Sequence, residues 1–291
     1  MLVRLAGRER DLGGSFRVQR LLPAVARRTV GPFVFLDHFG PIVFEPEMDI
    51  DVRPHPHIGL ATVTYLFEGA MNHRDSLGSS RRIEPGAINW MSAGRGIVHS
   101  ERTPPDLRTA RHRVHGLQLW VGLPQTMEDS APTFSHTPAE RLAPFTHQGA
   151  EVRLLVGDAF GRTSPVRAAS PTLFLVLRLN AGAELTLPAL GTELAVYSLD
   201  HGVFVNGSPV SERTLCVLAD ERLCILKATG DGTVVIIGGA PLEGPRLLWW
   251  NFVSSTKSRI EQAAADWRAQ RLGTIPGETD YIPLPDRLPT L

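Results

Sequence analysis

The chain has 291 residues, of which 43% are hydrophobic and 21% are charged, so its composition is that of a globular protein and not of a disordered or membrane-spanning one. Its 30 Lys and Arg residues balance 30 Asp and Glu residues, and this zero net charge disfavours direct binding to nucleic acid phosphates. Charges interrupt residues 1–11, and no segment approaches ~18 uninterrupted apolar residues. The sequence therefore predicts a cytoplasmic protein without a signal peptide or membrane contact.

Short runs rich in Val, Ile, Leu, Phe and Thr recur along the chain between Gly, Pro, Asn or Asp residues, a pattern typical of β-strands. The clearest runs are residues 31–36, 61–67, 117–121, 152–156, 173–179 and 233–237. Asn206 and Gly207 tolerate the positive φ of a tight turn, so a hairpin is expected there. Many short strands without intervening helices predict a mainly-β protein of sandwich or barrel architecture.

Residues 124–149 differ from this pattern, because prolines interrupt a polar stretch that carries no strand signal. We place a domain boundary within it, which divides the chain into residues 1–135 and 136–291. A helix is expected near the end of the second domain, with Ser258 as its N-cap and Glu261 completing a capping box. The residues that share its apolar face are Ile260, Ala264 and Trp267.

Nine of the ten histidines lie before residue 150, so any chemistry that depends on imidazole belongs to the first half. His55 and His57 alternate with Pro54 and Pro56 directly before a predicted strand. In an extended chain alternate side chains point to the same side, so both imidazoles face one space. The prolines restrict the backbone and lower the entropy cost of this alignment.

His99 and Glu101 repeat this spacing later in the same half. Two strands of one barrel would then direct three imidazoles and one carboxylate at one point, a donor set suited to six-coordinate Fe(II), Mn(II), Co(II) or Ni(II), with Zn(II) as an alternative. Such an ion keeps two open positions, which favours chemistry over a structural role. A lone His-x-His pair is often two surface or hydrogen-bonded histidines, but the recurrence of the spacing favours ligation.

The remaining histidines of the first half are not among the predicted ligands. His73 is expected to be a hydrogen-bonded turn histidine, with a place beside the metal ligands as the alternative. Surface positions are expected for His112, His115, His136 and His147.

Seven stretches of the first half form a specific combination of motifs. They are residues 31–41, 54–59 (Pro-His-Pro-His-Ile-Gly), 62–69, 73–76, 90–94, 96–101 (Gly-Ile-Val-His-Ser-Glu) and 117–120. In this combination the chain resembles the pirin family, within the cupin superfamily. Residues 238–242 and 250–253 resemble the same family more loosely.

The resemblance implies two cupin barrels packed together, with one mononuclear metal, commonly iron, in the N-terminal barrel. The ligand positions of the family match His55, His57, His99 and Glu101, so Fe(II) is the expected ion. Many cupins carry a further glutamate four residues after the second histidine, where this chain has Ala61. Glu101 is therefore the expected source of the carboxylate.

Aligned on Tyr65 and Tyr197, the second half has apolar residues where the first half has ligands. The equivalents are Leu187 and Ala189, or Pro188 and Leu190 with a shift of one residue, together with Leu226 and Ala228. We expect the second barrel to keep its shape and to hold no metal, which gives one ion per chain.

Two activities of different classes are attached to the family that the chain resembles. Some members resemble quercetin 2,3-dioxygenases, which open a flavonol ring with dioxygen and release carbon monoxide. The zero net charge and the lack of a basic tail favour this enzyme, with a flavonol-like substrate and O2 as its partners and Glu101 as the base that takes the hydroxyl proton of the substrate. The alternative is a metal- or redox-sensing regulator that acts through protein partners.

Overall fold

The structure is a computed structural model that describes residues 2–12, 16–48, 51–187, 193–218 and 223–286. The chain forms two compact units, and each unit combines three segments of the sequence. The first unit consists of Met1–Arg10, Gln19–Asp37 and Thr137–Pro241, and the second consists of Asp11–Val18, His38–His136 and Leu242–Leu291. The C-terminal segment thus belongs to the unit that contains most of the histidines.

Two antiparallel sheets form the first unit. The larger sheet has the order β1 (Leu2–Ala6), β22 (Thr214–Leu218), β19 (Glu193–Ser198), β24 (Gly232–Gly239), β17 (Thr172–Leu179), β14 (Ala150–Val156) and β13 (Phe145–His147). The smaller sheet has the order β18 (Glu184–Leu187), β23 (Cys224–Ala228), β20 (Val203–Val205) and β21 (Ser208–Val210), and β15 (Asp158–Ala159) pairs with β16 (Arg162–Thr163). Leu175, Val196 and Ile236 of the larger sheet share one apolar cluster with Leu185 and Leu226 of the smaller sheet. The core of this unit therefore lies between its two sheets.

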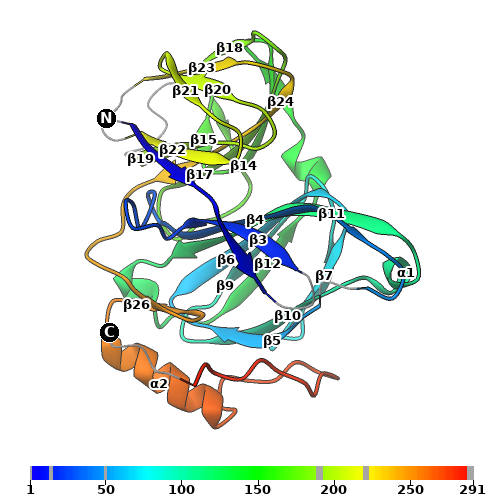
Figure 1. Cartoon of the computed structure of the whole chain (residues 1–291). Helices are drawn as coiled ribbons and strands as arrows, with labels where there is room; N and C mark the ends of the chain where they lie inside the picture. Colours follow the sequence, from blue (N-terminus) through cyan, green and yellow to red (C-terminus); the bar gives the residue numbers. More distant parts are fainter. Residues whose placement is uncertain (1, 13–15, 49–50, 188–192, 219–222, 287–291) are drawn as a thin grey trace. The chain divides into compact units, whose positions relative to one another are not determined.

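The other elements form two further sheets, one pair of strands, and the longest helix of the described residues (Figure 1). One sheet has the order β5 (Val52–His57), β10 (Ile97–Arg102), β7 (Met71–Asp75) and β8 (Ser80–Ile83). The other has the order β12 (Thr133–Thr137), β9 (Ile88–Ser92), β6 (Leu60–Glu68), β11 (His112–Gly122), β4 (Phe33–Phe44), β3 (Arg17–Leu22) and β2 (Arg8–Asp11). The remaining elements are α1 (Pro105–Arg108), the 3-10 turns η1 (Gln125–Met127) and η2 (Ala139–Leu142), β25 (Leu247–Trp249), β26 (Phe252–Ser254) and α2 (Lys257–Arg268).

The mainly-β architecture predicted from the sequence is confirmed, and each of the six predicted runs overlaps a strand. The hairpin between β20 and β21 also has its predicted turn, with φ of 49° at Asn206 and 74° at Gly207. Two strands, β12 and β13, lie in the stretch where the sequence indicated none. Both are short edge strands, and an edge strand with few buried side chains lacks the hydrophobic alternation that reveals an inner strand.

Helix α2 buries the predicted face, with Ile260, Ala264 and Trp267 in one cluster with Ile58 and Val98 beside the β5 and β10 strands. The predicted N-cap at Ser258 is wrong. The helix begins at Lys257, after Thr256 in an extended conformation, and no side chain caps it. Glu128 accepts hydrogen bonds from the backbone and hydroxyl of Ser255, so a tertiary contact fixes the chain before the helix begins.

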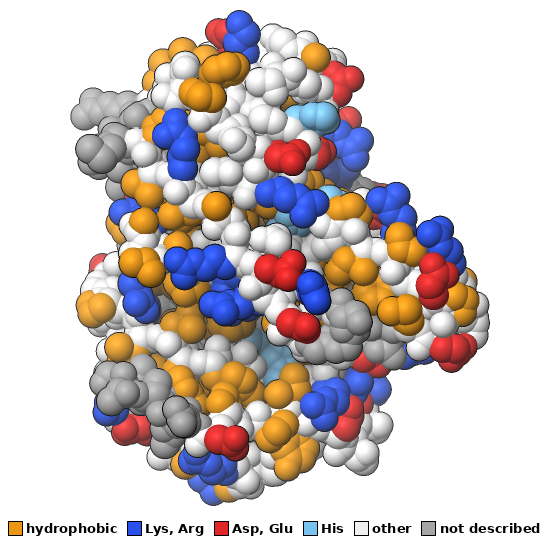
Figure 2. All heavy atoms as spheres, in the orientation of Figure 1, with side chains coloured by type: hydrophobic (Ala, Val, Ile, Leu, Met, Phe, Trp, Pro, Cys, Tyr) orange, Lys and Arg blue, Asp and Glu red, His pale blue; other side chains and the backbone are white. Residues whose placement is uncertain are grey.

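None of the helices in the described part of the chain is both long and apolar enough to cross a membrane. On the face of the molecule that Figure 2 shows, positive and negative side chains are interspersed. This mixture agrees with the zero net charge of the sequence.

Candidate metal centre

The two predicted ligand pairs lie on β5 and β10, which are neighbouring antiparallel strands. His99 lies directly opposite His55 in this register, and their ring centroids are 4.3 Å apart. One donor atom from each of His55, His57 and His99 lies within 4.8 Å of the others. The alternation predicted from the sequence therefore brings three imidazoles together.

A close backbone contact follows β5 and fixes the position of His57. Gly59 has φ of 66°, and a Cβ atom at this position would collide with the carbonyl oxygen of Val253. The Val253 N–H donates to the Ile58 carbonyl at 3.2 Å. Only glycine permits this close approach at a positive φ. The approach brings the turn that contains Asn251 beside the His57 ring.

Hydrogen bonds to backbone carbonyls orient two of the three rings. The Nδ1 atom of His55 lies 2.8 Å from the Arg53 carbonyl oxygen, and that of His57 lies 3.0 Å from the Asn251 carbonyl oxygen. Because a carbonyl only accepts, each Nδ1 carries the proton and donates it, which leaves Nε2 with a lone pair. Metal-binding histidines commonly have this arrangement.

The site fits a divalent transition metal. Burial lowers the pKa of His55 to about 4 and holds the pKa values of His57 and His99 well below the usual value, so all three imidazoles are neutral. The Nδ1 atom of His99 is buried without a hydrogen-bond partner among the described residues. Its Nε2 atom lies 3.1 Å from the Nε2 atom of His57. Two uncharged nitrogen atoms that can act as metal ligands therefore lie close together, and one cation could bind both.

Glu101 lies in the same barrel but outside the three-histidine group. It is 8% exposed, and burial raises the pKa of its carboxyl to about 7. The hydroxyl of Thr64, on β6, lies 3.4 Å from Glu101 Oε1, so the carboxylate reaches toward the opposite sheet. A bulge interrupts the β5–β10 register between His99 and Glu101, and bulges change the direction of nearby side chains.

The turn predicted at His73 is wrong, because His73 lies within β7. It is buried, its Nε2 atom is 3.1 Å from Asp75 Oδ2, and its ring stacks on Phe134 at 4.2 Å. Its ring centroid is 5.3 Å from that of His99. The His-x-Asp spacing was the signal that could have placed this residue beside the cluster, since it repeats the alternation of the ligands.

None of the four histidines expected at the surface is fully exposed: His112 is buried, and His115, His136 and His147 are half-buried. His112 is 9% exposed and stacks on Phe44. His115 is half-buried, and its Nε2 atom lies 2.7 Å from that of His38 on the adjacent strand β4. His112 and His115 both lie on β11, which combines apolar side chains with Arg113 and Gln118, so the sequence pattern did not reveal that His112 is buried.

In the second half, the described equivalents of the ligands are core residues. Leu187 and Leu226 are fully buried and Ala228 is 5% exposed. The other proposed equivalents, Pro188, Ala189 and Leu190, lie outside the described residues. His201, the one histidine of this half, is exposed in the loop between β19 and β20.

Comparisons with known proteins agree with this arrangement. Residues 15–121 match the family described as Pirin, and residues 174–273 match the Pirin C-terminal cupin domain. A pirin-like protein from Caulobacter vibrioides is 47% identical over 96% of this chain and 97% of its own length. The chain belongs to the pirin family. The first pirin match contains all four predicted ligand positions.

A crystal structure of quercetin 2,3-dioxygenase from Acinetobacter baumannii is also similar to this pirin-family chain. Its TM-score is 0.92 at 34% sequence identity, and the match covers 100% of this chain and 96% of that one. Pirin from Mus musculus is 31% identical over 91% of each chain. The two cupin-type domains that the resemblance implied are thereby confirmed.

Proposed function

We propose that this chain is a metal-dependent dioxygenase of the quercetin 2,3-dioxygenase type, which opens a flavonol-like ring with dioxygen and releases carbon monoxide. The observation that carries the proposal is the cluster of three neutral imidazoles in one barrel with the buried carboxylate of Glu101. The similarity to the A. baumannii quercetin 2,3-dioxygenase over the whole chain supports it.

His55, His57 and His99 would hold the ion, with Glu101 as the fourth ligand. We propose Fe(II), because a mixed set of imidazole and carboxylate donors with open positions suits this ion. When bound, the ion would supply Lewis acidity toward a substrate hydroxyl and redox chemistry toward dioxygen.

Glu101 is the general base in this proposal. Ring opening of a flavonol requires loss of the proton of its 3-hydroxyl group, and a carboxylate at the edge of the site accepts such a proton over one hydrogen bond. The Thr64 hydroxyl lies 2.9 Å from Gln118 Oε1 and 3.4 Å from Glu101 Oε1. Thr64 therefore helps to hold the carboxylate within the barrel.

The burial of the site suits chemistry that must exclude water. His55 is 7% exposed and Glu101 is 8% exposed, while His57 and His99 are 1% exposed. A dry site strengthens the interaction of Glu101 with a polar substrate group and limits side reactions with water.

The test is a turnover assay with protein that has been loaded anaerobically with Fe(II). Addition of quercetin and dioxygen should bleach the flavonol absorbance band, consume dioxygen and release carbon monoxide. The His57→Ala variant, treated in the same way, is the control. If the loaded wild type neither consumes dioxygen nor bleaches quercetin or a related flavonol, the dioxygenase proposal is wrong, and the regulator that acts through protein partners replaces it.

A further inference from the structure

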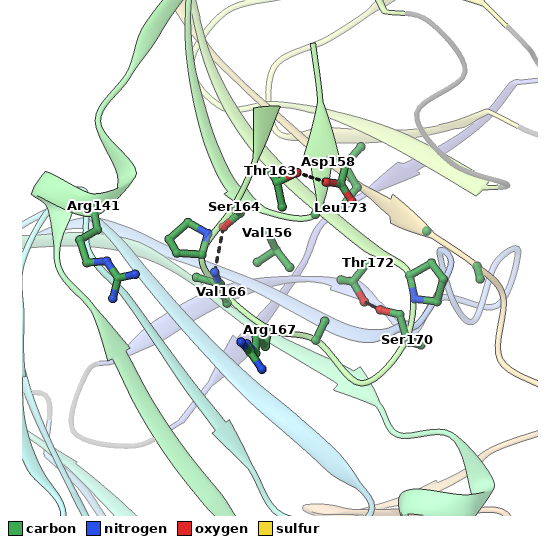
Figure 3. Close-up of a pocket in the computed structure, with 16 residues that line it drawn as sticks. Arg141, Val156, Asp158, Thr163, Ser164, Val166, Arg167, Ser170, Thr172 and Leu173 are labelled. Carbon is green, nitrogen blue, oxygen red and sulfur yellow. Dashed lines mark hydrogen bonds between the residues drawn. The ribbon is translucent and has the colours of Figure 1, made fainter. Parts of the chain in front are cut away.

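The first unit contains a cavity that is separate in sequence and in chemistry from the histidine cluster. Its volume is about 800 Å³, which lies in the range of small-molecule pockets. The cavity is bounded by the end of β14, the β15–β16 pair, the loop before β17 and the end of β24 (Figure 3). All of its lining residues belong to the first unit.

Two guanidinium groups line the cavity without a counter-charge. Arg141 extends from η2 and Arg167 from the loop before β17, and no hydrogen bond in Figure 3 ends at either side chain. Both residues are exposed, and within the described ranges neither has an ion pair. Asp158 is the one acidic residue among the described lining residues, and it already accepts a hydrogen bond from the Thr163 hydroxyl at 2.5 Å. The cavity is therefore positively charged.

The other residues that line the cavity include both apolar and polar side chains. Val156, Val166 and Leu173 are buried residues that present apolar surface to the cavity. The Ser170 hydroxyl is also buried, and it has no hydrogen-bond partner in the part of the chain that the structure describes. A buried polar atom without a partner is uncommon in folded proteins.

We propose that this cavity binds a small organic carboxylate with an apolar body. Arginine is the side chain best suited to a carboxylate, because its fork of N–H donors matches the two oxygens. Arg141 and Arg167 would bind the carboxylate, and Val156, Val166 and Leu173 would contact the apolar body. An inorganic anion would leave these apolar contacts unused, so the lining favours an organic ligand.

The test measures binding of benzoate by isothermal titration calorimetry, with inorganic phosphate as the second probe. Arg141→Gln and Arg167→Gln should each weaken benzoate binding about tenfold, equivalent to about 1.4 kcal/mol. Arg178→Gln is the matched control, because Arg178 is exposed on the same unit, pairs with Glu151 at 3.7 Å and does not line the cavity. This control should bind benzoate as the wild type does.

A further variant separates this site from the metal centre. His57→Ala should bind benzoate with unchanged affinity, since His57 belongs to the second unit. Failure of the dioxygenase assay would therefore leave this result intact. The proposal is overturned if benzoate does not bind, if phosphate binds at least as tightly, if Arg178→Gln weakens binding as much as Arg167→Gln, or if His57→Ala abolishes binding. Thermal unfolding of each variant checks that the fold is retained.

Discussion

The Nε2 atoms of His57 and His99 lie 3.1 Å apart, although the two residues are 42 positions apart in the sequence. Two nitrogen ligands about 2.1 Å from one ion lie about 3.0 Å apart when they subtend a right angle at it. The observed separation is therefore compatible with both nitrogens binding one ion.

Replacement of His57 by alanine should remove the metal and leave the fold in place. The variant loses one of three imidazoles, and the remaining two are a weaker chelate. Elemental analysis after anaerobic loading should show at least a tenfold lower metal content, with an unchanged circular dichroism spectrum. His201→Ala, at an exposed histidine of the other unit, should load as the wild type does. Full metal retention in His57→Ala would contradict the ligand assignment.

Metal should also stabilise the protein against heat. An ion that binds only the folded state at 100 times its Kd adds about 2.7 kcal/mol to the free energy of unfolding. For domains of this size the midpoint Tm should rise by roughly 5 to 10 °C. Differential scanning calorimetry with and without a chelator measures the shift. The same experiment on His57→Ala should show no shift, and an equal shift in both proteins would place the ion elsewhere.

The alternation of side-chain directions along each extended segment was enough to predict the cluster of histidines. His55 and His57 share one side of β5, and the register places His99 opposite His55, as two short extended segments with the same spacing suggest. Burial of Ile260, Ala264 and Trp267 was likewise visible in the helical period. Within each strand and within the helix, the side-chain direction depends on neighbours a few residues away, which a sequence displays directly.

Contacts between distant segments were not visible in the sequence. The carbonyl of Asn251 orients His57 from 194 positions away, and a backbone carbonyl has no residue-type signal. His73 was misplaced because its ring partner, Phe134, lies in an edge strand without a hydrophobic pattern. Glu128, which fixes the chain before α2, is likewise distant from Ser255 in sequence.

A buried ion pair anchors the segment that carries Asn251. Arg246 Nε lies 3.0 Å from Glu128 Oε1, and the two side chains are 2% and 7% exposed. Glu128 also accepts hydrogen bonds from the hydroxyls of Ser254 and Ser255. The turn at Asn251 is therefore held at both ends by one carboxylate.

Arg246→Met should destabilise the protein by about 3 kcal/mol, because it leaves the buried carboxylate of Glu128 without its counter-charge. The variant should also bind metal about tenfold more weakly, since the Asn251 carbonyl no longer holds His57 in place. Urea unfolding and metal titration measure the two effects. Lys257→Met, which breaks the exposed pair with Glu261, should change stability by less than about 1 kcal/mol. A normal metal affinity in Arg246→Met would show that His57 does not depend on this anchor.

Glu101→Gln separates the two roles proposed for this residue. Glutamine keeps an oxygen donor of similar size, so metal content should fall only in part. It cannot accept the hydroxyl proton of the substrate, so turnover of quercetin per bound metal should fall by about 10²-fold or more, the scale of a lost general base. Thr64→Val, which removes the hydroxyl near Glu101 but keeps the carboxylate, should lower turnover less and leave the metal content unchanged. Comparable turnover per metal in Glu101→Gln and wild type would exclude Glu101 as the base, and would limit its role to that of a ligand.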